Sequence, residues 1–346
     1  MSLDIRRQVS LQRYNSLALD AKAEYFCRLT TIQEVQQAVA FADANKLAIT
    51  VLGCGSNVVL KSELAGLIVL VQLTGISHRR AGNDIYVTVG AGEDWSSLVA
   101  SSLGNSWFGL ENLALIPGSM GAAPIQNIGA YGVELCDRFV SLEAIHRRTG
   151  EICSMDRLDC EFGYRDSIFK NRELNNYIII EVCIKLSTKP INNWHYPELR
   201  SALEEKLGSL TASGVTPQLI ADTVTEIRRA KLPDPALWPN AGSFFKNPLL
   251  DRTQLASLVV AEPQIPVYPV AGGLSKVPAA WLIERCGLRG HRVEQVGIHS
   301  KQALVLINYG GSSGRQLLAL AEHMQRAVKE KFDIYLEIEP TIYGSF

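Results

Sequence analysis

One segment constrains the fold of this 346-residue chain more than any other. No charged residue occurs from Leu113 to Val133, and a helix of about 20 such residues could span a bilayer. The same segment holds two prolines and four glycines, which are incompatible with a regular helix that faces lipid. We therefore expect buried, irregular backbone in a protein that does not insert into membranes.

The side chains of this segment are small where a protein core normally holds large ones. Such a stretch would leave voids and unpaired backbone groups unless something large filled the space. A planar cofactor with a polar rim would do both. The alternative is a buried irregular connection without a ligand.

The charge balance excludes some kinds of partner. Lysine plus arginine number 34 and aspartate plus glutamate number 35, whereas a general nucleic-acid or membrane-surface binder would show a basic excess. The seven cysteines form no CxxC pair, so we expect reduced thiols and no metal site. The N-terminus lacks the apolar core of a signal peptide, and together these features indicate a cytoplasmic protein.

The chain length predicts two or three domains, and hydrophobic periodicity predicts an α+β or mixed α/β class. Thr31 and Glu34 have the spacing of a capping box, and Asp94 could cap a helix that runs to Leu103. The segment Lys231–Asn240 holds three prolines and is a candidate linker. Strands are predicted at 47–52, 67–73, 84–90, 139–146, 177–186, 302–308 and 334–338, and further helices at 216–230, 252–260, 278–286 and 314–331.

A second glycine-rich loop, Gly53–Asn57, follows a predicted strand. Backbone N–H groups in such a loop can form an anion-binding nest for a pyrophosphate, although an ordinary tight turn is the alternative. The loop lacks the dinucleotide-binding fingerprint, since Val58 stands where the third glycine belongs. Gly310, Gly311 and Gly314 lack the lysine of a P-loop. A Rossmann site and a P-loop are therefore both disfavoured.

Six sequence blocks extend these observations to most of the chain. In order they are GCGSN, GLENLALIPGSMGAAPIQNIGAYG, FGYRDSIFK, KLPDP, NAGSFFKNP and LEIEP. Together they resemble the MurB family, from about residue 15 to residue 344. The segment Trp194–Leu199 resembles the tyrosine-bearing loop of that family's first structural type, which is found in many Gram-negative bacteria.

This resemblance implies a specific architecture. It implies an FAD-binding fold of the vanillyl-alcohol-oxidase type, made of two α/β subdomains, plus a C-terminal α+β substrate-binding domain. We expect residues 1–74 with 333–346 in the first FAD subdomain, 75–232 in the second and 233–332 in the substrate domain.

The resemblance also implies an activity in peptidoglycan precursor synthesis. FAD and the cosubstrate NADPH would reduce UDP-N-acetylglucosamine enolpyruvate to UDP-N-acetylmuramate, with hydride from flavin N5. Arg165 and Glu339 match the family's enolate-stabilising positions, and Ser243 matches its proton donor. Glu337 competes with Glu339 for that role, since residues two apart on a strand face the same side.

Further residues are implied as ligand contacts. The expected FAD contacts are Gly53, Gly55, Ser56, Asn57, Gly118, Ser119, Gly121, Asn127, Ile128 and Gly129. The expected substrate contacts are Tyr164, Tyr196, Lys231, Lys246 and Asn247. Arg228 is a weaker candidate for a phosphate contact, and no residue is assigned to a metal. Ala18 departs from the family pattern, which has glycine there, and Thr341 departs from its arginine.

Two other classes of function stay open at this point. One is a flavin oxidase or dehydrogenase of the same broad fold with another substrate. The other is a flavin- or nucleotide-binding regulatory protein without turnover, and a purely structural protein is a more distant alternative. For the reductase we expect a monomer whose partners are the UDP-sugar and NADPH, without nucleic acid.

Overall fold

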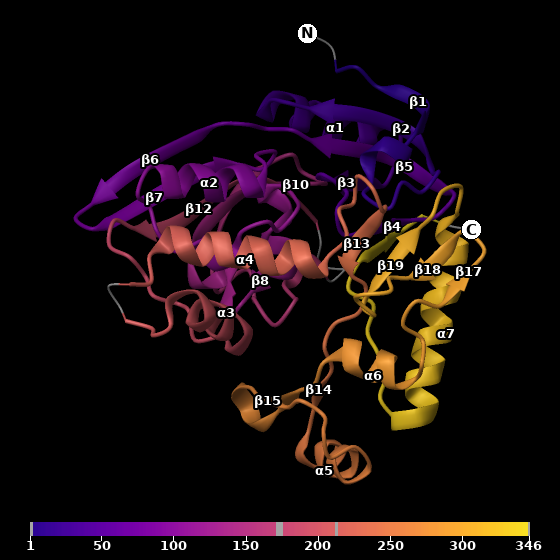
Figure 1. Ribbon diagram of the computed structural model, residues 1–346. Coiled ribbons are helices and arrows are strands. Elements are labelled where there is room, and N and C mark those ends of the chain that lie inside the picture. Colours follow the sequence, from indigo (N-terminus) through magenta and orange to yellow (C-terminus); the bar gives the residue numbers. More distant parts are fainter. Residues whose placement is uncertain (1–2, 171–175, 212–213, 345–346) are drawn as a thin grey trace. The chain divides into compact units, whose positions relative to one another are not determined.

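The computed structural model describes residues 3–170, 176–211 and 214–344 (Figure 1). Their contacts define two compact units. Unit 1 comprises Met1–Val9, Ala23–Cys54 and Ala65–Ala230, and unit 2 comprises Ser10–Lys22, Gly55–Leu64 and Lys231–Phe346. The three predicted domains stay a prediction, and their outermost residues, 1–2 and 345–346, lie outside the described residues.

The first sheet has four strands in the order β1-β2-β5-β3. Its strands are β1 (Arg6–Ser10), β2 (Lys22–Leu29), β3 (Ile49–Leu52) and β5 (Glu63–Val71). Helix α1 (Ile32–Ala44) joins β2 to β3, and its predicted capping box is confirmed, because Glu34 N–H donates to Thr31 Oγ1 while the Glu34 carboxylate accepts from Thr31 N–H. β3 pairs with β5 in parallel, as expected for strands joined through other elements.

A five-stranded antiparallel sheet, in the order β11-β10-β12-β7-β6, forms the rest of the framework of unit 1. Its strands are β6 (Ile76–Ala81), β7 (Asp84–Gly90), β10 (Phe139–His146), β11 (Ile152–Asp156) and β12 (Tyr177–Ser187). The predicted bounds of β7 and β10 are confirmed. Alternate residues of β7, Ile85, Val87 and Val89, are buried, which fixes the face of the sheet that covers the core.

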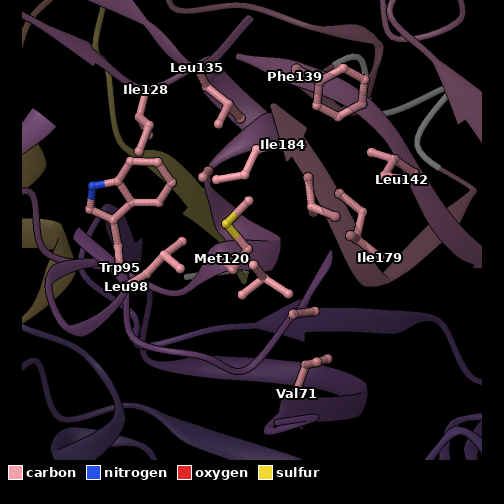
Figure 2. Packing of buried hydrophobic residues seen from close by; sticks show 14 of the residues in the cluster. Val71, Trp95, Leu98, Met120, Ile128, Leu135, Phe139, Leu142, Ile179 and Ile184 are labelled. Atoms are coloured by element: carbon pink, nitrogen blue, oxygen red, sulfur yellow. The ribbon is translucent and has the colours of Figure 1, made fainter. Parts of the chain in front are cut away.

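Three helices complete unit 1, namely α2 (Trp95–Gly104), α3 (Pro197–Leu207) and α4 (Pro217–Lys231). The predicted cap of α2 is confirmed, since the Asp94 carboxylate accepts from Ser97 N–H over 2.8 Å. Figure 2 shows Trp95 of α2 packed near Met120 and Ile128, so the uncharged segment supplies part of this core. Trp95 Nε1 donates to the Leu113 carbonyl over 3.0 Å, which satisfies the buried indole.

The uncharged segment is irregular, and this expectation is confirmed. From Glu111 to Glu134, a stretch that includes this segment, the chain forms the short 3-10 turns Glu111–Leu113, Met120–Ala122 and Pro124–Gln126, followed by the two-residue strands β8 (Gly129–Ala130) and β9 (Val133–Glu134). No helix in the described part of the chain is long and apolar enough to cross a membrane.

In the described part of unit 2 the strands form three small sheets. The first, in the order β13-β19-β18-β17, is built from β13 (Asn240–Ser243), β17 (Arg292–Val293), β18 (Val296–Ile298) and β19 (Val305–Asn308). The second sheet consists of β14 (Leu249–Leu250), β15 (Tyr268–Pro269) and β16 (Ser275–Lys276). In the third sheet, β4 (Val58–Leu60) pairs with β20 (Thr341–Tyr343). The helices are α5 (Arg252–Ala261), α6 (Ala279–Arg285) and α7 (Gly314–Phe332), with α7 beside β18 (Figure 1).

The strand predicted at residues 334–338 is wrong. Only Ile338 forms an isolated bridge, with Phe245, and the regular strand of this region is β20, which pairs in parallel with β4. Around this bridge Lys246 N–H donates to the Glu337 carbonyl over 2.9 Å and Glu339 N–H donates to the Phe244 carbonyl over 3.0 Å, so the pairing is too short for a regular strand. The carbonyl of Leu336 instead accepts from the Gln325 side chain over 2.7 Å.

Candidate functional site

The two glycine-rich loops meet within unit 1. A Cβ on Gly53 would lie 2.4 Å from Ser119 Oγ, and a Cβ on Gly121 would lie 2.6 Å from the Cβ of Ala91. Both distances are far below van der Waals contact, so each glycine permits a close approach that alanine would prevent. The Gly53 contact therefore packs the first loop directly against the second, although they are distant in sequence, and the Gly121 contact packs the second loop against Ala91.

The backbone of the second loop is anchored to the segment before α2. Trp95 N–H donates to the Gly118 carbonyl over 3.0 Å, Met120 N–H to the Glu93 carbonyl over 2.8 Å, and Gly121 N–H to the Ala91 carbonyl over 2.8 Å. Ser119 lies between these bonds and is 4% exposed. The loop is thus firmly held although it contains no regular helix or strand.

These loops fit the chemistry of FAD. Neither Gly53–Asn57 nor the uncharged segment contains an acidic side chain, and their glycines let a ligand come close to backbone N–H groups. Gly55 has a φ of +65°, and a Cβ there would lie 2.0 Å from the Tyr14 carbonyl oxygen, so this turn requires glycine.

The predicted FAD contacts of the first loop continue in unit 2. Ser16 Oγ donates to the Ser56 carbonyl over 3.3 Å, and Thr341 N–H donates to the Asn57 carbonyl over 3.1 Å. The carbonyl oxygens at these two positions therefore face protein groups. This arrangement fixes the backbone of the loop at its second half.

Asn127, another predicted FAD contact, lies in a buried polar cluster. It is fully buried, with a left-handed φ of 45°. Its Nδ2 donates to Glu134 Oε2 over 2.9 Å and to the Gly163 carbonyl over 3.0 Å, and its Oδ1 accepts from Cys136 N–H over 2.9 Å. Because the side-chain amide is engaged within the protein, an FAD contact of this residue would use its backbone.

Arg165 belongs to the same cluster. Its Nη2 donates to the Gly129 carbonyl, its Nη1 lies 3.9 Å from Glu134 Oε1, and its Cζ lies 5.4 Å from the centre of the Tyr164 ring. The Arg165 side chain is 19% exposed and that of Glu134 is 34% exposed. Glu134 was missed at the level of the sequence, because its spacing from Arg165 carries no local signal.

The structure strengthens Arg228 as a candidate for a phosphate contact. Its Nε is buried and has no hydrogen-bond partner in the described part of the chain. Burial lowers the pKa of Arg228, and the charge of Arg165 lowers it further. Two arginines that repel each other, one of them incompletely satisfied, favour an anionic ligand between or beside them.

Tyr196, the predicted substrate contact, lies at the start of α3. Its ring meets that of Tyr131 edge to face, with centroids 5.5 Å apart. Burial raises the pKa of Tyr131 to about 12, so its phenol stays protonated at neutral pH. α3 itself was missed, although Pro197 at its first turn and Leu199 and Leu203 one turn apart could have indicated it.

Ser243 and Glu339 are brought together within unit 2. Ser243 ends β13, opposite Val305 of β19, and the next residue, Phe244, accepts from Glu339 N–H over 3.0 Å. Gly242 has a φ of +69°, and no atom lies within 4 Å of the position of a Cβ there. The serine is thus flanked by open space on a turn that favours glycine.

The neighbouring candidates have protein partners. Lys246 Nζ lies 2.6 Å from Glu337 Oε1, and the lysine side chain is 11% exposed. Asn247 Oδ1 accepts from Ala279 N–H over 3.0 Å, at the start of α6. Lys231 is the last residue of α4. Glu337 is therefore tied to Lys246.

The predicted site residues are divided between the two units. Unit 1 holds Gly53, Gly118, Ser119, Gly121, Asn127, Ile128, Gly129, Tyr164, Arg165 and Tyr196. Unit 2 holds Gly55, Ser56, Asn57, Lys231, Ser243, Lys246, Asn247 and Glu339.

Comparison with known proteins accounts for both units. The FAD binding domain family matches residues 23–156, and the family of UDP-N-acetylenolpyruvoylglucosamine reductase C-terminal domains matches residues 234–343. The chain is 42% identical to the UDP-N-acetylenolpyruvoylglucosamine reductase of Chromobacterium violaceum, over 99% of this chain and 100% of that protein. The chain belongs to the MurB family.

Other members of the MurB family agree with this assignment. The Pseudomonas aeruginosa reductase is 43% identical, over 99% of this chain and 100% of that protein. The crystal structure of MurB from Thermus caldophilus matches with a TM-score of 0.67 at 22% identity, over 99% of this chain and 100% of that one. The predicted α+β fold with an FAD-binding part and a C-terminal MurB domain is confirmed.

Proposed function

We propose that this chain is an FAD-containing, NADPH-dependent reductase that converts UDP-N-acetylglucosamine enolpyruvate to UDP-N-acetylmuramate. The observation that carries the proposal is the match along nearly the whole chain to reductases of that name. The packed loops around Gly53 and Ser119 support the cofactor, because they allow close backbone approach and contain no acidic residue of their own. We expect a cytoplasmic monomer.

When bound, FAD supplies the hydride that adds to the enol ether. Negative charge then develops on the adjacent carbon and its carboxylate. Arg165 is proposed to stabilise that charge, because a guanidinium stays protonated and can grip a carboxylate with two N–H groups.

Ser243 is proposed to deliver the proton to the carbanion. A hydroxyl is a weak acid, but its target is a strong base, and the open position at Gly242 lets a substrate approach. Glu339 is proposed to act near the same carbon, because its backbone is paired with the residue after Ser243. Tyr164, Tyr196, Lys231, Lys246 and Asn247 are proposed as substrate contacts.

A two-stage measurement tests this function. The purified protein should be yellow, with the absorbance of one bound FAD. NADPH oxidation should then depend on UDP-N-acetylglucosamine enolpyruvate and yield UDP-N-acetylmuramate. A colourless protein that takes up no FAD, or a reduced flavin that this substrate leaves unoxidised, would overturn the proposal.

A further inference from the structure

The backbone of Arg165 does not by itself set the direction of the side chain. The residue has a left-handed φ of 52° and lies outside the helices and strands of unit 1. Non-glycine residues adopt this conformation at a cost, so the surroundings must hold it. An arginine also has many rotamers, and the guanidinium needs external contacts to keep one orientation.

Those contacts come from three sides. The Gly129 carbonyl accepts from Nη2, the Glu134 carboxylate lies beside Nη1, and the Tyr164 ring lies 5.4 Å from Cζ. A carbonyl and a ring fix position but carry no net charge. The Glu134 carboxylate is charged and lies within 4 Å of the guanidinium, so it adds an electrostatic restraint to the other two contacts.

Glu134 is itself held firmly. Its Oε2 accepts from the fully buried Asn127 over 2.9 Å, while Oε1 faces Arg165. Its side chain also accepts from the Asp137 backbone N–H, and its own N–H donates to Asp137 Oδ2 over 2.9 Å, in a reciprocal cap. The carboxylate is thus fixed by its neighbours while its Oε1 lies 3.9 Å from Arg165 Nη1.

Gly129 shows how tightly this arrangement is packed. A Cβ there would lie 2.9 Å from Glu134 Cγ and 3.0 Å from Arg165 Nη1. The glycine is therefore required by the close approach of the glutamate and the arginine. This requirement does not depend on any ligand.

We propose that Glu134, fixed by Asn127, is a positioning residue that orients the Arg165 guanidinium toward the substrate carboxylate. This inference rests on the proposed function and adds a residue to it. Glu134 touches neither the reacting carbon nor the cofactor in this role. Its removal should therefore affect only the step that uses Arg165.

The test compares Glu134→Gln with wild type after the flavin has been reduced with dithionite. The glutamine side chain of this variant can still accept from Asn127, but its amide would present N–H groups to the arginine. We expect reoxidation by UDP-N-acetylglucosamine enolpyruvate to slow roughly 10²-fold, as for a misplaced catalytic group. The FAD dissociation constant and the melting temperature should stay close to wild type, which a merely structural role would not allow.

Two further variants make the result decisive. In an Arg165→Ala background, Glu134→Gln should add no further loss, because both substitutions remove the same interaction. Glu143→Gln, on β10 and outside the cluster, is the matched control and should react at the wild-type rate. If Glu134→Gln binds FAD poorly, Glu134→Asp keeps the charge and should show a smaller loss of the same kind.

The outcomes separate the two proposals. Wild-type protein that fails to react would overturn the proposed function. Normal wild-type reaction with an unaffected Glu134→Gln variant, or an equal added loss in the Arg165→Ala background, would overturn the positioning role alone.

Discussion

The backbone N–H of Glu339 donates a 3.0 Å hydrogen bond to the carbonyl oxygen of Phe244. Phe244 directly follows Ser243, so this bond holds a segment near the C-terminus beside the proposed proton donor. The adjacent bridge between Phe245 and Ile338 extends the pairing. Two of the three proposed catalytic residues are thus kept together by main-chain contacts that side-chain substitutions leave intact.

Replacing Ser243 by alanine should therefore remove the hydroxyl without disturbing the backbone. We expect FAD to bind and to be reduced as in wild type. Oxidation of the reduced flavin by substrate should slow by about 10²–10³-fold, the range for losing one preorganised donor. Stopped-flow absorbance measures both half-reactions. Ser257→Ala, on the exposed side of α5, is the control, and a Ser243→Ala variant as fast as this control would exclude the proposed role.

The two glutamates near the C-terminus should differ in their effects. Glu339→Gln should lower the rate of substrate reduction by roughly 10²-fold, because it removes a charge proposed to act at the reacting carbon. Glu337→Gln breaks the pair with Lys246, and the glutamate side chain is 63% exposed, so stability should change by less than about 1 kcal/mol. Steady-state kinetics and thermal unfolding compare them. A larger loss of the rate of substrate reduction in Glu337→Gln than in Glu339→Gln would assign the role to Glu337.

Gly121→Ala should disturb the loop that is proposed to hold FAD. The new methyl group would overlap the Cβ of Ala91, and such overpacking costs about 1–3 kcal/mol. The FAD content after purification and the melting temperature should both fall. Gly104→Ala is the matched control, since nothing lies within 4 Å of its Cβ position, and helical alanine should raise stability by about 0.5–1 kcal/mol. Equal behaviour of both variants would contradict the packing argument.

The resemblance places Ala18 where the MurB family pattern has glycine, and the φ of 49° at this residue is a conformation that favours glycine. Ala18→Gly should relieve the strain of a left-handed alanine and raise the free energy of unfolding by roughly 0.5–1 kcal/mol. The same substitution at Ala100, on the exposed side of α2, should lower it by about 1 kcal/mol. Urea unfolding gives the free energy of unfolding of both variants. A lower free energy of unfolding in both would show that strain at Ala18 is negligible.

Glu111 should make the stability depend on pH. It is 2% exposed, and burial raises its pKa more than the backbone hydrogen bonds, including that from Gly109, lower it. The folded state therefore binds the proton more tightly than the unfolded state does. The stability from this group is complete below the unfolded carboxyl's pKa and is lost as the pH rises through the folded pKa. Urea unfolding measures the free energy of unfolding from acidic to neutral pH. This free energy should decline less with pH in Glu111→Gln than in wild type, and identical declines would contradict this assignment.

Some elements were predictable because their determinants are local. The cap formed by Thr31 and Glu34 lies within one helical turn, and the same holds for Asp94 and Ser97. The alternation of apolar residues fixed the bounds of β7, since one face of that strand is buried. The run at 334–338 had a similar composition, but its backbone pairs with residues 244–246 over a single bridge, so it did not form a regular strand.

The candidate site divides in the same way. The sequence blocks were sufficient to name Arg165, Ser243 and Glu339 as candidates, because each block carries a characteristic set of neighbours. The partnership of Glu134 with Asn127 and Arg165 was not predictable. It depends on how a two-residue strand and a distant turn pack, and no spacing in the sequence encodes that distance.

By itself, then, the sequence determined the irregular, uncharged segment, the helix caps and the family blocks, since each depends on residues close together in the chain. Only the tertiary structure decided that Gly53 packs against Ser119, that Glu339 pairs with Phe244, and that Glu134 faces Arg165. These contacts join residues far apart in sequence. They form because burial of the surrounding apolar side chains brings the backbones together, and that free energy belongs to the whole unit rather than to any one segment.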